Sequence, residues 1–147
     1  MNRIKHRVGI VGSPEVVWDA LIEPEKLSGW WSSSADGNCE IEGILNLHFA
    51  GLTTLIFEIT GRDEHRFLHF RNIGGPDSWR GSDLEFQLRP SDGQTFLTLL
   101  HSSDRASEEE FQFFVTKWPL FLVSLKAYVE IGKGLPFPND IKIEAEL

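Results

Sequence analysis

The sequence predicts an α+β fold in which an antiparallel sheet of about six or seven strands packs on one long C-terminal helix. Segments that alternate apolar and polar residues follow one another through the middle of the chain, separated by short turns. This pattern is typical of strands joined by hairpins. A far more apolar segment then occupies residues 107–132, between a helix start signal and a helix stop signal. With 147 residues, of which 41% are hydrophobic, the chain can bury one sizeable core.

The N-terminal part predicts a strand followed by one or two short helices. Residues 3–11 alternate aliphatic with basic side chains, as expected of a strand with one face in water. His6 falls on the apolar side and is interpreted as a core histidine. Ser13 and Pro14 then form the cap and first-turn signature of a helix. Pro24 ends that helix, and a second short helix is expected just after it.

Six further strands are expected, because the middle of the chain holds three pairs of alternating segments, each pair flanking a short turn. These segments are residues 38–42, 44–50, 53–60, 65–72, 79–89 and 94–102. The clearest turn is Pro-Ser-Asp-Gly at 90–93. A sheet of this many strands twists and curls, so a space lined by aromatic side chains can remain between sheet and helix.

The long helix has matched signals at both ends. Ser107 and Glu110 have the spacing of a capping box, and Gly132 is placed to end the helix in a left-handed conformation. The helix between them is about 24 residues, or roughly 36 Å, long. Pro119 lies in its middle and removes the hydrogen bond to the Val115 carbonyl. Two interpretations stay open: a bend that follows the sheet, or a carbonyl offered to a ligand.

Composition excludes several function classes. A net charge of −8, with one short basic cluster near the N-terminus, argues against a nucleic-acid-binding protein. Cys39 is the one cysteine, so no internal disulfide is expected. The histidines have no metal-ligand spacing, and neither a metal nor a cofactor is expected. No apolar run is long enough for a membrane span, and no signal peptide is expected, which predicts a cytoplasmic protein.

Four motifs, in order, resemble those of a known superfamily. They are S-P-E-V-V-W-D-A-L-I at 13–22, the tryptophan-bearing segment at 27–31, T-F-L-T-L-L-H-S at 95–102, and W-P-L-F-L-V-S-L-K-A-Y-V-E-I-G at 118–132. The chain resembles the START-like helix-grip (SRPBCC) superfamily. Within it, the chain is most similar to small proteins related to the activator of the ninety-kilodalton heat-shock protein's ATPase. The chain departs from the family pattern at Lys117, where a small residue is usual, and at His69, where an inward aromatic is expected.

The resemblance implies a helix-grip domain at residues 1–135, in which a curved sheet wraps around the long helix. Residues 136–147 then form a C-terminal extension. Its aliphatic residues Ile141, Ile143, Ala145 and Leu147 alternate with charged ones. We therefore expect an extended segment that docks its aliphatic side on the domain or on a neighbouring copy.

Members of the superfamily bind lipids and polyketides, cyclise them, or act as co-chaperones, so the fold alone leaves function open. The primary expectation is a module that binds a small hydrophobic or amphipathic molecule between helix and sheet, without fixed catalysis. One alternative is a cyclase- or hydrolase-like enzyme that uses a cavity histidine. The other is a co-chaperone-like stress-response domain with a chaperone partner, as a monomer or homodimer. The sequence does not identify the ligand.

The expected ligand-binding residues combine aromatic and aliphatic positions that face the helix or the sheet with three polar candidates. The polar candidates are His69, Arg71 and His101, because the strands that carry them otherwise show an alternating apolar pattern. The sequence leaves open which face of the strand with His69 and Arg71 lines the cavity. The apolar candidates are Trp30, Phe49, Phe57, Phe86, Phe111, Val115, Trp118 and Leu122.

Overall fold

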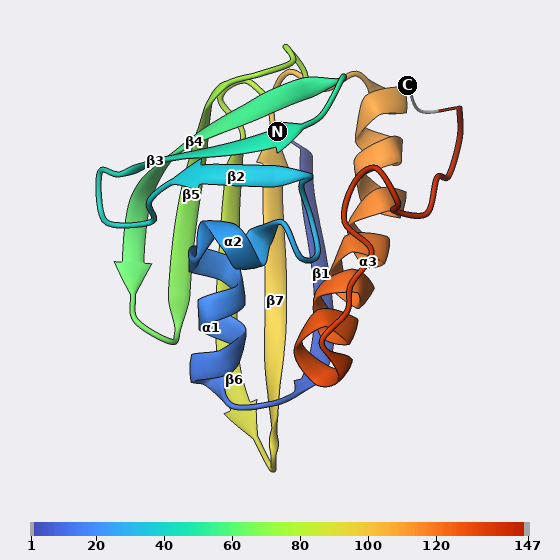
Figure 1. Ribbon diagram of the computed structural model, residues 1–147. Coiled ribbons are helices and arrows are strands. Elements are labelled where there is room, and N and C mark those ends of the chain that lie inside the picture. The colour runs from blue at the N-terminus through green and yellow to red at the C-terminus, as the bar shows by residue number, and fades with distance from the viewer. Residues whose placement is uncertain (1, 146–147) are drawn as a thin grey trace.

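The computed structural model describes residues 2–145 and has the expected order of elements: one strand, two short helices, six strands and a long helix. Within these residues the strands form one antiparallel sheet in the order β1-β7-β6-β5-β4-β3-β2 (Figure 1). The strands are β1 (Asn2–Val11), β2 (Ser34–Gly37), β3 (Ile44–Phe49), β4 (Thr53–Asp63), β5 (Phe67–Gly74), β6 (Asp83–Ser91) and β7 (Gln94–Ser103). The helices are α1 (Pro14–Ile22), α2 (Pro24–Leu27) and α3 (Glu108–Ile131).

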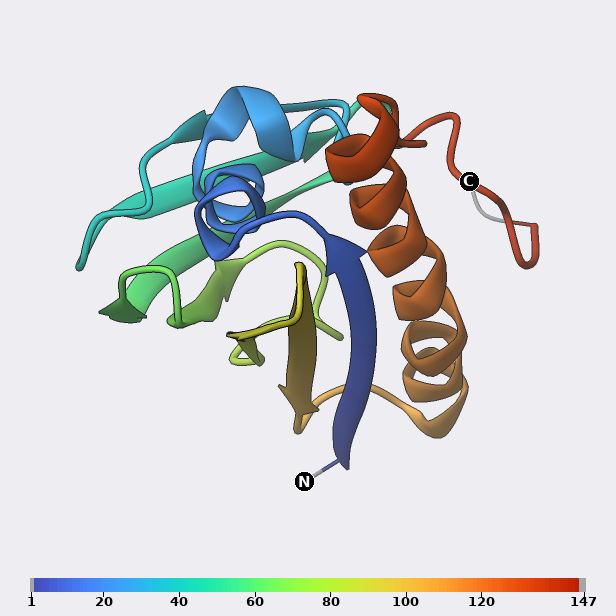
Figure 2. The same cartoon turned by 90° about the horizontal axis from the view of Figure 1, so that it is seen from below.

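The topology explains how the sheet acquires its curved shape. Every consecutive pair from β2 to β7 is an antiparallel neighbour, and β1 pairs with β7 along its full length. The short helices α1 and α2 carry the chain from one edge strand to the other. Seen from below, the sheet forms an open trough, with α1 lying in the trough and α3 running beside β1 (Figure 2). This is the helix-grip fold.

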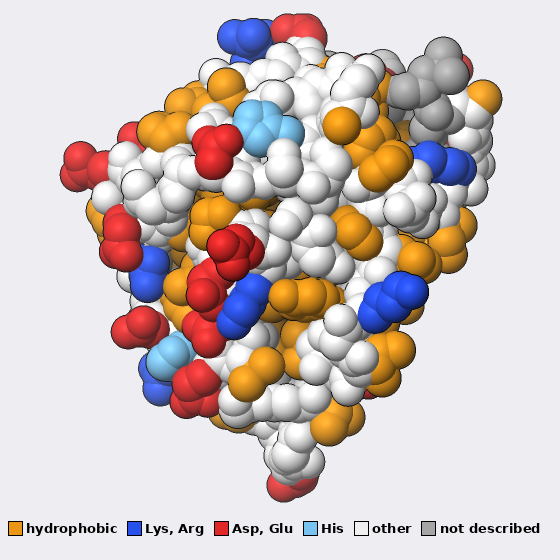
Figure 3. All heavy atoms as spheres, in the orientation of Figure 1, with side chains coloured by type: hydrophobic (Ala, Val, Ile, Leu, Met, Phe, Trp, Pro, Cys, Tyr) orange, Lys and Arg blue, Asp and Glu red, His pale blue; other side chains and the backbone are white. Residues whose placement is uncertain are grey.

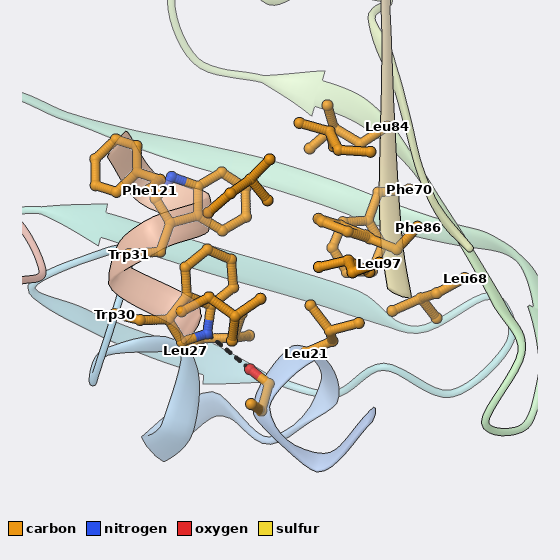
Figure 4. Close-up of a cluster of buried hydrophobic side chains, with 14 of the residues drawn as sticks. Leu21, Leu27, Trp30, Trp31, Leu68, Phe70, Leu84, Phe86, Leu97 and Phe121 are labelled. Atoms are coloured by element: carbon orange, nitrogen blue, oxygen red, sulfur yellow. Dashed lines mark hydrogen bonds between the residues drawn. The ribbon is translucent and has the colours of Figure 1, made fainter. Parts of the chain in front are cut away.

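The alternation of the strands places the core as expected. Leu45, Leu47, Phe57 and Phe86 are at most 1% exposed and face the interior of the trough. The Nε1 of Trp30 donates a hydrogen bond to the carbonyl of Ala20 at 2.9 Å, inside a cluster of buried side chains contributed by the sheet and the helices (Figure 4). This bond satisfies the indole where water cannot reach it.

The long helix has the predicted ends. The Ser107 hydroxyl accepts a hydrogen bond from the Glu110 amide, and the Glu110 carboxylate accepts one from the Ser107 amide. Gly132 has a φ of 79°, the left-handed conformation that glycine adopts without strain. The helix continues through Pro119, and the Nε2 of His6 donates to the Val115 carbonyl at 3.0 Å. The carbonyl that Pro119 leaves without a helical partner is therefore bound by β1.

Three boundaries differ from the sequence expectation. The second strand is residues 34–37 rather than 38–42, because residues 38–43 form the turn into β3. A register shift between Ile59 and Gly61 lets β4 continue to Asp63, which moves the expected turn at 61–63 to the next three residues. The sixth strand begins at Asp83, so Trp79 lies in the preceding loop and not in a strand.

The chain after α3 turns back along this helix (Figure 1). Its described part has no strand, and its anchors are Phe137, which is half-buried, and Asp140, which is 8% exposed. Ile141 is 54% exposed, so the expected burial of the aliphatic side does not hold at that residue. Leu147, part of the same expectation, lies outside the described residues. Within residues 2–145, no helix has the length and apolar character required to span a membrane.

Candidate functional site

A cavity of about 1090 Å³ lies between the N-terminal half of α3 and one end of the sheet. Four segments border it and leave it partly open to solvent: the β3–β4 turn, the loop between β5 and β6, the N-terminal half of α3, and the chain after α3. Its volume is close to the upper end of the range of about 300–1,000 Å³ that sites for small organic molecules have. On the face shown in Figure 3, by contrast, exposed apolar side chains form separate groups among charged and polar atoms.

Aromatic side chains make up the floor of this cavity. Trp31 and Trp118 pack with ring centroids 5.2 Å apart, and Trp79 packs on Phe114 at 5.3 Å. Phe49 reaches the rim, where its ring contacts the Phe137 ring at 5.5 Å. Such surfaces bind apolar carbon by removing it from water, at about 25 cal/mol per Å².

His101 lies directly behind this floor and is fully buried. The Trp79 ring stacks on its imidazole with centroids 4.6 Å apart. The indole Nε1 of Trp118 donates to His101 Nδ1 at 3.0 Å, so the proton of the neutral ring is on Nε2. Burial lowers the pKa of His101 from 6.5 to about 4, because the charged form loses its hydration. The imidazole is therefore neutral at pH 7 and has an indole, not a carboxylate, at Nδ1.

The chain after α3 forms one wall of the cavity. Lys117 and Asp140 both line it and form an ion pair at 2.6 Å, with side chains 8% and 4% exposed. The Lys117 ammonium also donates to the Ile141 carbonyl at 2.6 Å. Burial alone would raise the pKa of Asp140, but hydrogen bonds from Lys117 and Lys142 outweigh it and keep that pKa below its usual value. The departure from the family pattern at Lys117 is thus tied to a partner in the C-terminal extension.

The mouth of the cavity carries acidic side chains. Glu108 and Glu109 of α3 and Glu144 of the C-terminal extension line it. The two α3 glutamates also lie in the first turn of the helix, where the helix dipole favours negative charge. Since the Lys117 ammonium is paired with Asp140, the carboxylates of Glu108 and Glu109 make the entrance unfavourable for an anion.

The structure places the expected site residues in three groups. Phe49 and Trp118 line the cavity. Seven others belong to the buried interior or pack against it without lining the cavity: Trp30, Phe57, Phe86, His101, Phe111, Val115 and Leu122. Val115 is half-buried and presents its carbonyl to His6.

The third group, His69 and Arg71, lies on the outer face of the sheet. On β5 the buried residues are Leu68, Phe70 and Asn72, so the two residues that alternate with them point away from the trough. His69 Nε2 is 3.4 Å and Arg71 Nη1 is 3.3 Å from Asp83 Oδ1. The inward position expected for His69 is therefore corrected.

A second histidine has a similar environment on the same outer face. The His48 Nε2 contacts Asp36 at 2.6 Å, and its Nδ1 contacts the Thr54 hydroxyl at 3.0 Å. A threonine, histidine and aspartate in series suggest nucleophilic catalysis. However, none of the three lines the cavity. They are interpreted as cross-strand polar pairs.

Several cavity residues were not anticipated from the sequence. Trp31 was passed over for its neighbour Trp30, and Trp79 was assigned to a strand. The position of Trp79 could have been found from Gly81, which marks a break between the loop and β6 and has a φ of 77°. Among residues 2–145, no three histidine, cysteine, aspartate or glutamate side chains come together as metal ligands.

Comparisons with known proteins place this chain in a family. A sequence model described as "Activator of Hsp90 ATPase homolog 1-like protein" matches residues 12–130. The Aha1 dimer from Colwellia psychrerythraea is 33% identical and superposes with a TM-score of 0.82, over 91% of this chain and 100% of that chain. No curated protein matches this chain.

Two further solved structures share the fold at lower identity. DynU16, from the dynemicin biosynthetic locus, is 17% identical with a TM-score of 0.78, over 91% of this chain and 49% of its own. CalU16 from Micromonospora echinospora is 18% identical with a TM-score of 0.69, over 87% and 74%. The family match, which covers most of the chain, is decisive: the chain belongs to the Activator of Hsp90 ATPase homolog 1-like family of the helix-grip superfamily.

Proposed function

We propose that this protein binds a small apolar or amphipathic molecule in the cavity between α3 and the sheet. The observation that carries this proposal is the cavity of about 1090 Å³ with an aromatic floor. The cavity is partly open to solvent, and an aromatic floor exposed in this way is typical of ligand sites, which are concave and lined mainly by apolar side chains. The fold supports ligand binding in general, because a curved sheet and a long helix can enclose a ligand between them.

The geometry favours binding over catalysis. A cyclase or hydrolase of this type needs a histidine within reach of a substrate and oriented by an acidic partner. His101 is the histidine nearest the cavity floor, and its Nδ1 accepts from Trp118 instead of donating to a carboxylate. With its pKa lowered to about 4, it is also a weak base at pH 7.

The proposal is tested by two matched variants. Phe113→Ala removes a half-buried ring that lines the cavity, and Phe96→Ala removes a half-buried ring from the outer face of β7. We expect Phe113→Ala to weaken the binding of an aromatic probe such as 2-naphthol about tenfold, which corresponds to about 1.4 kcal/mol of lost contact. The Phe96→Ala affinity should equal that of the unmodified protein. Equal losses in both variants, or no binding below millimolar probe, would contradict the proposal.

The family name supports a second candidate, stimulation of the Hsp90 ATPase. The Colwellia relative is described as an Aha1 dimer, so a homodimer is part of the same candidate. Hsp90 ATP hydrolysis measured with and without this protein, alongside light scattering, separates this candidate from ligand binding alone. A cytoplasmic location belongs to the proposal as well. It fits Cys39, the one cysteine of the chain, which is a free thiol.

A further inference from the structure

The inner face of the sheet is mostly apolar, and its buried polar residues fall into two kinds. Thr95 and Ser103 of β7 are hydrogen-bonded within the protein, Thr95 to the Gly12 carbonyl and Ser103 to the Ala106 amide. Three others, close to the cavity, are not fully paired.

Asn72 of β5, Ser82 just before β6, and His101 of β7 are each at most 1% exposed. The backbone brings them together: the Asn72 amide donates to the Ser82 carbonyl at 2.8 Å, and Leu84, two residues after Ser82, pairs with His101. We call these three residues the polar row.

The polar row holds most of the unpaired buried polar atoms. Within residues 2–145, five buried side-chain nitrogen or oxygen atoms have no hydrogen-bond partner in the protein. Three of the five are Asn72 Oδ1, Ser82 Oγ and His101 Nε2. Each such atom costs about 1–3 kcal/mol if it is left unpaired. Three on neighbouring strands, offset by no more than one same-face step in the register, therefore call for a partner that the protein itself does not supply, an ordered water or a ligand group.

The neighbouring bonds define what that partner must offer. The Asn72 Nδ2 donates to the Gly74 carbonyl at 3.0 Å, which leaves the amide oxygen as an acceptor. His101 Nδ1 accepts from Trp118, which leaves Nε2–H as a donor. The Ser82 hydroxyl can donate and accept. A hydroxyl group, which also donates and accepts, matches this set.

One side chain connects the polar row to the cavity. Trp79 lines the cavity and stacks on the His101 ring at 4.6 Å. It lies on a loop bounded by Gly75 and Gly81, with φ angles of 124° and 77°. Glycines at both ends allow large backbone changes at low cost. A shift of the Trp79 ring would open the His101 end of the polar row to the cavity.

We propose that the polar row is the specificity-determining end of the ligand site and that it binds a neutral hydroxyl, such as a phenol, on an otherwise apolar ligand. This inference rests on the proposed binding function. The ligand is neutral because the row contains no charged side chain, Glu108 and Glu109 line the mouth, and the Lys117 ammonium in the cavity wall is already paired with Asp140. An anion would have to pass these carboxylates and lose its hydration next to uncharged groups.

Three probes of nearly equal size test the proposal: 2-naphthol, 2-methylnaphthalene and 2-naphthoate. Affinities are measured by NMR titration of the tryptophan indole N–H resonances. We expect 2-naphthol to bind at least tenfold more tightly than the other two and to move the Trp79 and Trp118 signals. Ser82→Ala should lower only the 2-naphthol affinity, toward that of 2-methylnaphthalene.

Ser82→Ala is the informative variant because it removes an unpaired atom and should leave the fold intact. Thermal unfolding of this variant, with no loss of stability expected, serves as the control. Equal affinities for 2-naphthol and 2-methylnaphthalene, unchanged by Ser82→Ala, would overturn the polar-row proposal and leave the binding function standing. Tightest binding of 2-naphthoate would overturn the preference for a neutral ligand. Binding of none of the probes would overturn both the polar-row proposal and the proposed function.

Discussion

The ion pair between Lys117 and Asp140 is expected to hold the C-terminal extension against the cavity. Removing one partner of a buried pair typically costs about 3–5 kcal/mol, because the other charge stays buried and unpaired. In Asp140→Asn the C-terminal extension can detach from α3 and expose Lys117 to water, so the loss of stability is limited to the contacts that the extension makes. Its other anchors include the hydrogen bond from the Phe137 amide to the Trp31 carbonyl at 2.9 Å and the contact between the Phe137 and Phe49 rings. Each is worth about 1 kcal/mol, so Asp140→Asn should cost about 2–3 kcal/mol in total.

Urea and thermal unfolding measure this loss, which corresponds to a melting temperature lower by about 5–10 °C. The matched control is Asp77→Asn, which breaks an ion pair of 2.9 Å with Arg105 whose side chains are 83% and 52% exposed. That change should leave the melting temperature unchanged. Adding Lys117→Met to Asp140→Asn should restore at least about 1 kcal/mol, since the extension can then dock without burying an unpaired ammonium. If Asp140→Asn unfolds like Asp77→Asn, the pair does not hold the extension.

The same pair predicts a dependence on pH. The pKa of Asp140 is lowered in the folded protein. The ionised carboxylate therefore stabilises the fold fully above pH 3.8, the usual pKa of an aspartate, and this stabilisation is lost as the pH falls below that value.

Two further changes test other parts of the account. His101 has its pKa lowered from 6.5 to about 4, so the unfolded chain takes up the proton first and stability falls as the pH drops through this window. Between pH 7 and 5 the free energy of unfolding, measured with urea, should fall by about 2 kcal/mol. In His101→Gln this fall should be much smaller. An equal pH dependence of stability in both proteins would refute the assignment to His101. His6→Phe should cost about 1 kcal/mol by leaving the Val115 carbonyl unpaired. In a Pro119→Ala background the loss should be smaller, because the alanine N–H can bond to the Val115 carbonyl in place of His6. If the effects of His6→Phe and Pro119→Ala on stability are strictly additive, His6 does not serve as the partner of this carbonyl.

The fold was predictable because local signals agree with burial. Alternation in β3, β4 and β6 identified Leu45, Phe57 and Phe86 as inward, and each is buried. The helix ends were predictable because capping depends on residues close in sequence, here Ser107 and Glu110. Boundaries failed where the sheet is irregular. The register shift after Ile59 inserts an extra residue, which alternation alone does not reveal.

The candidate site was less predictable, because its residues come together only in three dimensions. In β5, apolar residues occur at both alternations, so the sequence did not show that His69 faces out while Asn72 faces in. Trp30 and Trp31 are adjacent and both buried, and the sequence did not show that Trp31 is the one that lines the cavity while Trp30 bonds to the Ala20 carbonyl. Lys117 stood out as a departure from the family, but its partner lies in an extension beyond the matched residues.

Intermolecular nuclear Overhauser effects between bound 2-naphthol and the protein's side chains test the central claim most directly. The account predicts contacts from the naphthol ring to Trp31, Phe114 and Trp118 on the cavity floor. Contacts confined to the outer face of the sheet, around Phe96 between Arg7 and Arg89, would contradict it. In that case the cavity between α3 and the sheet would not be the binding site.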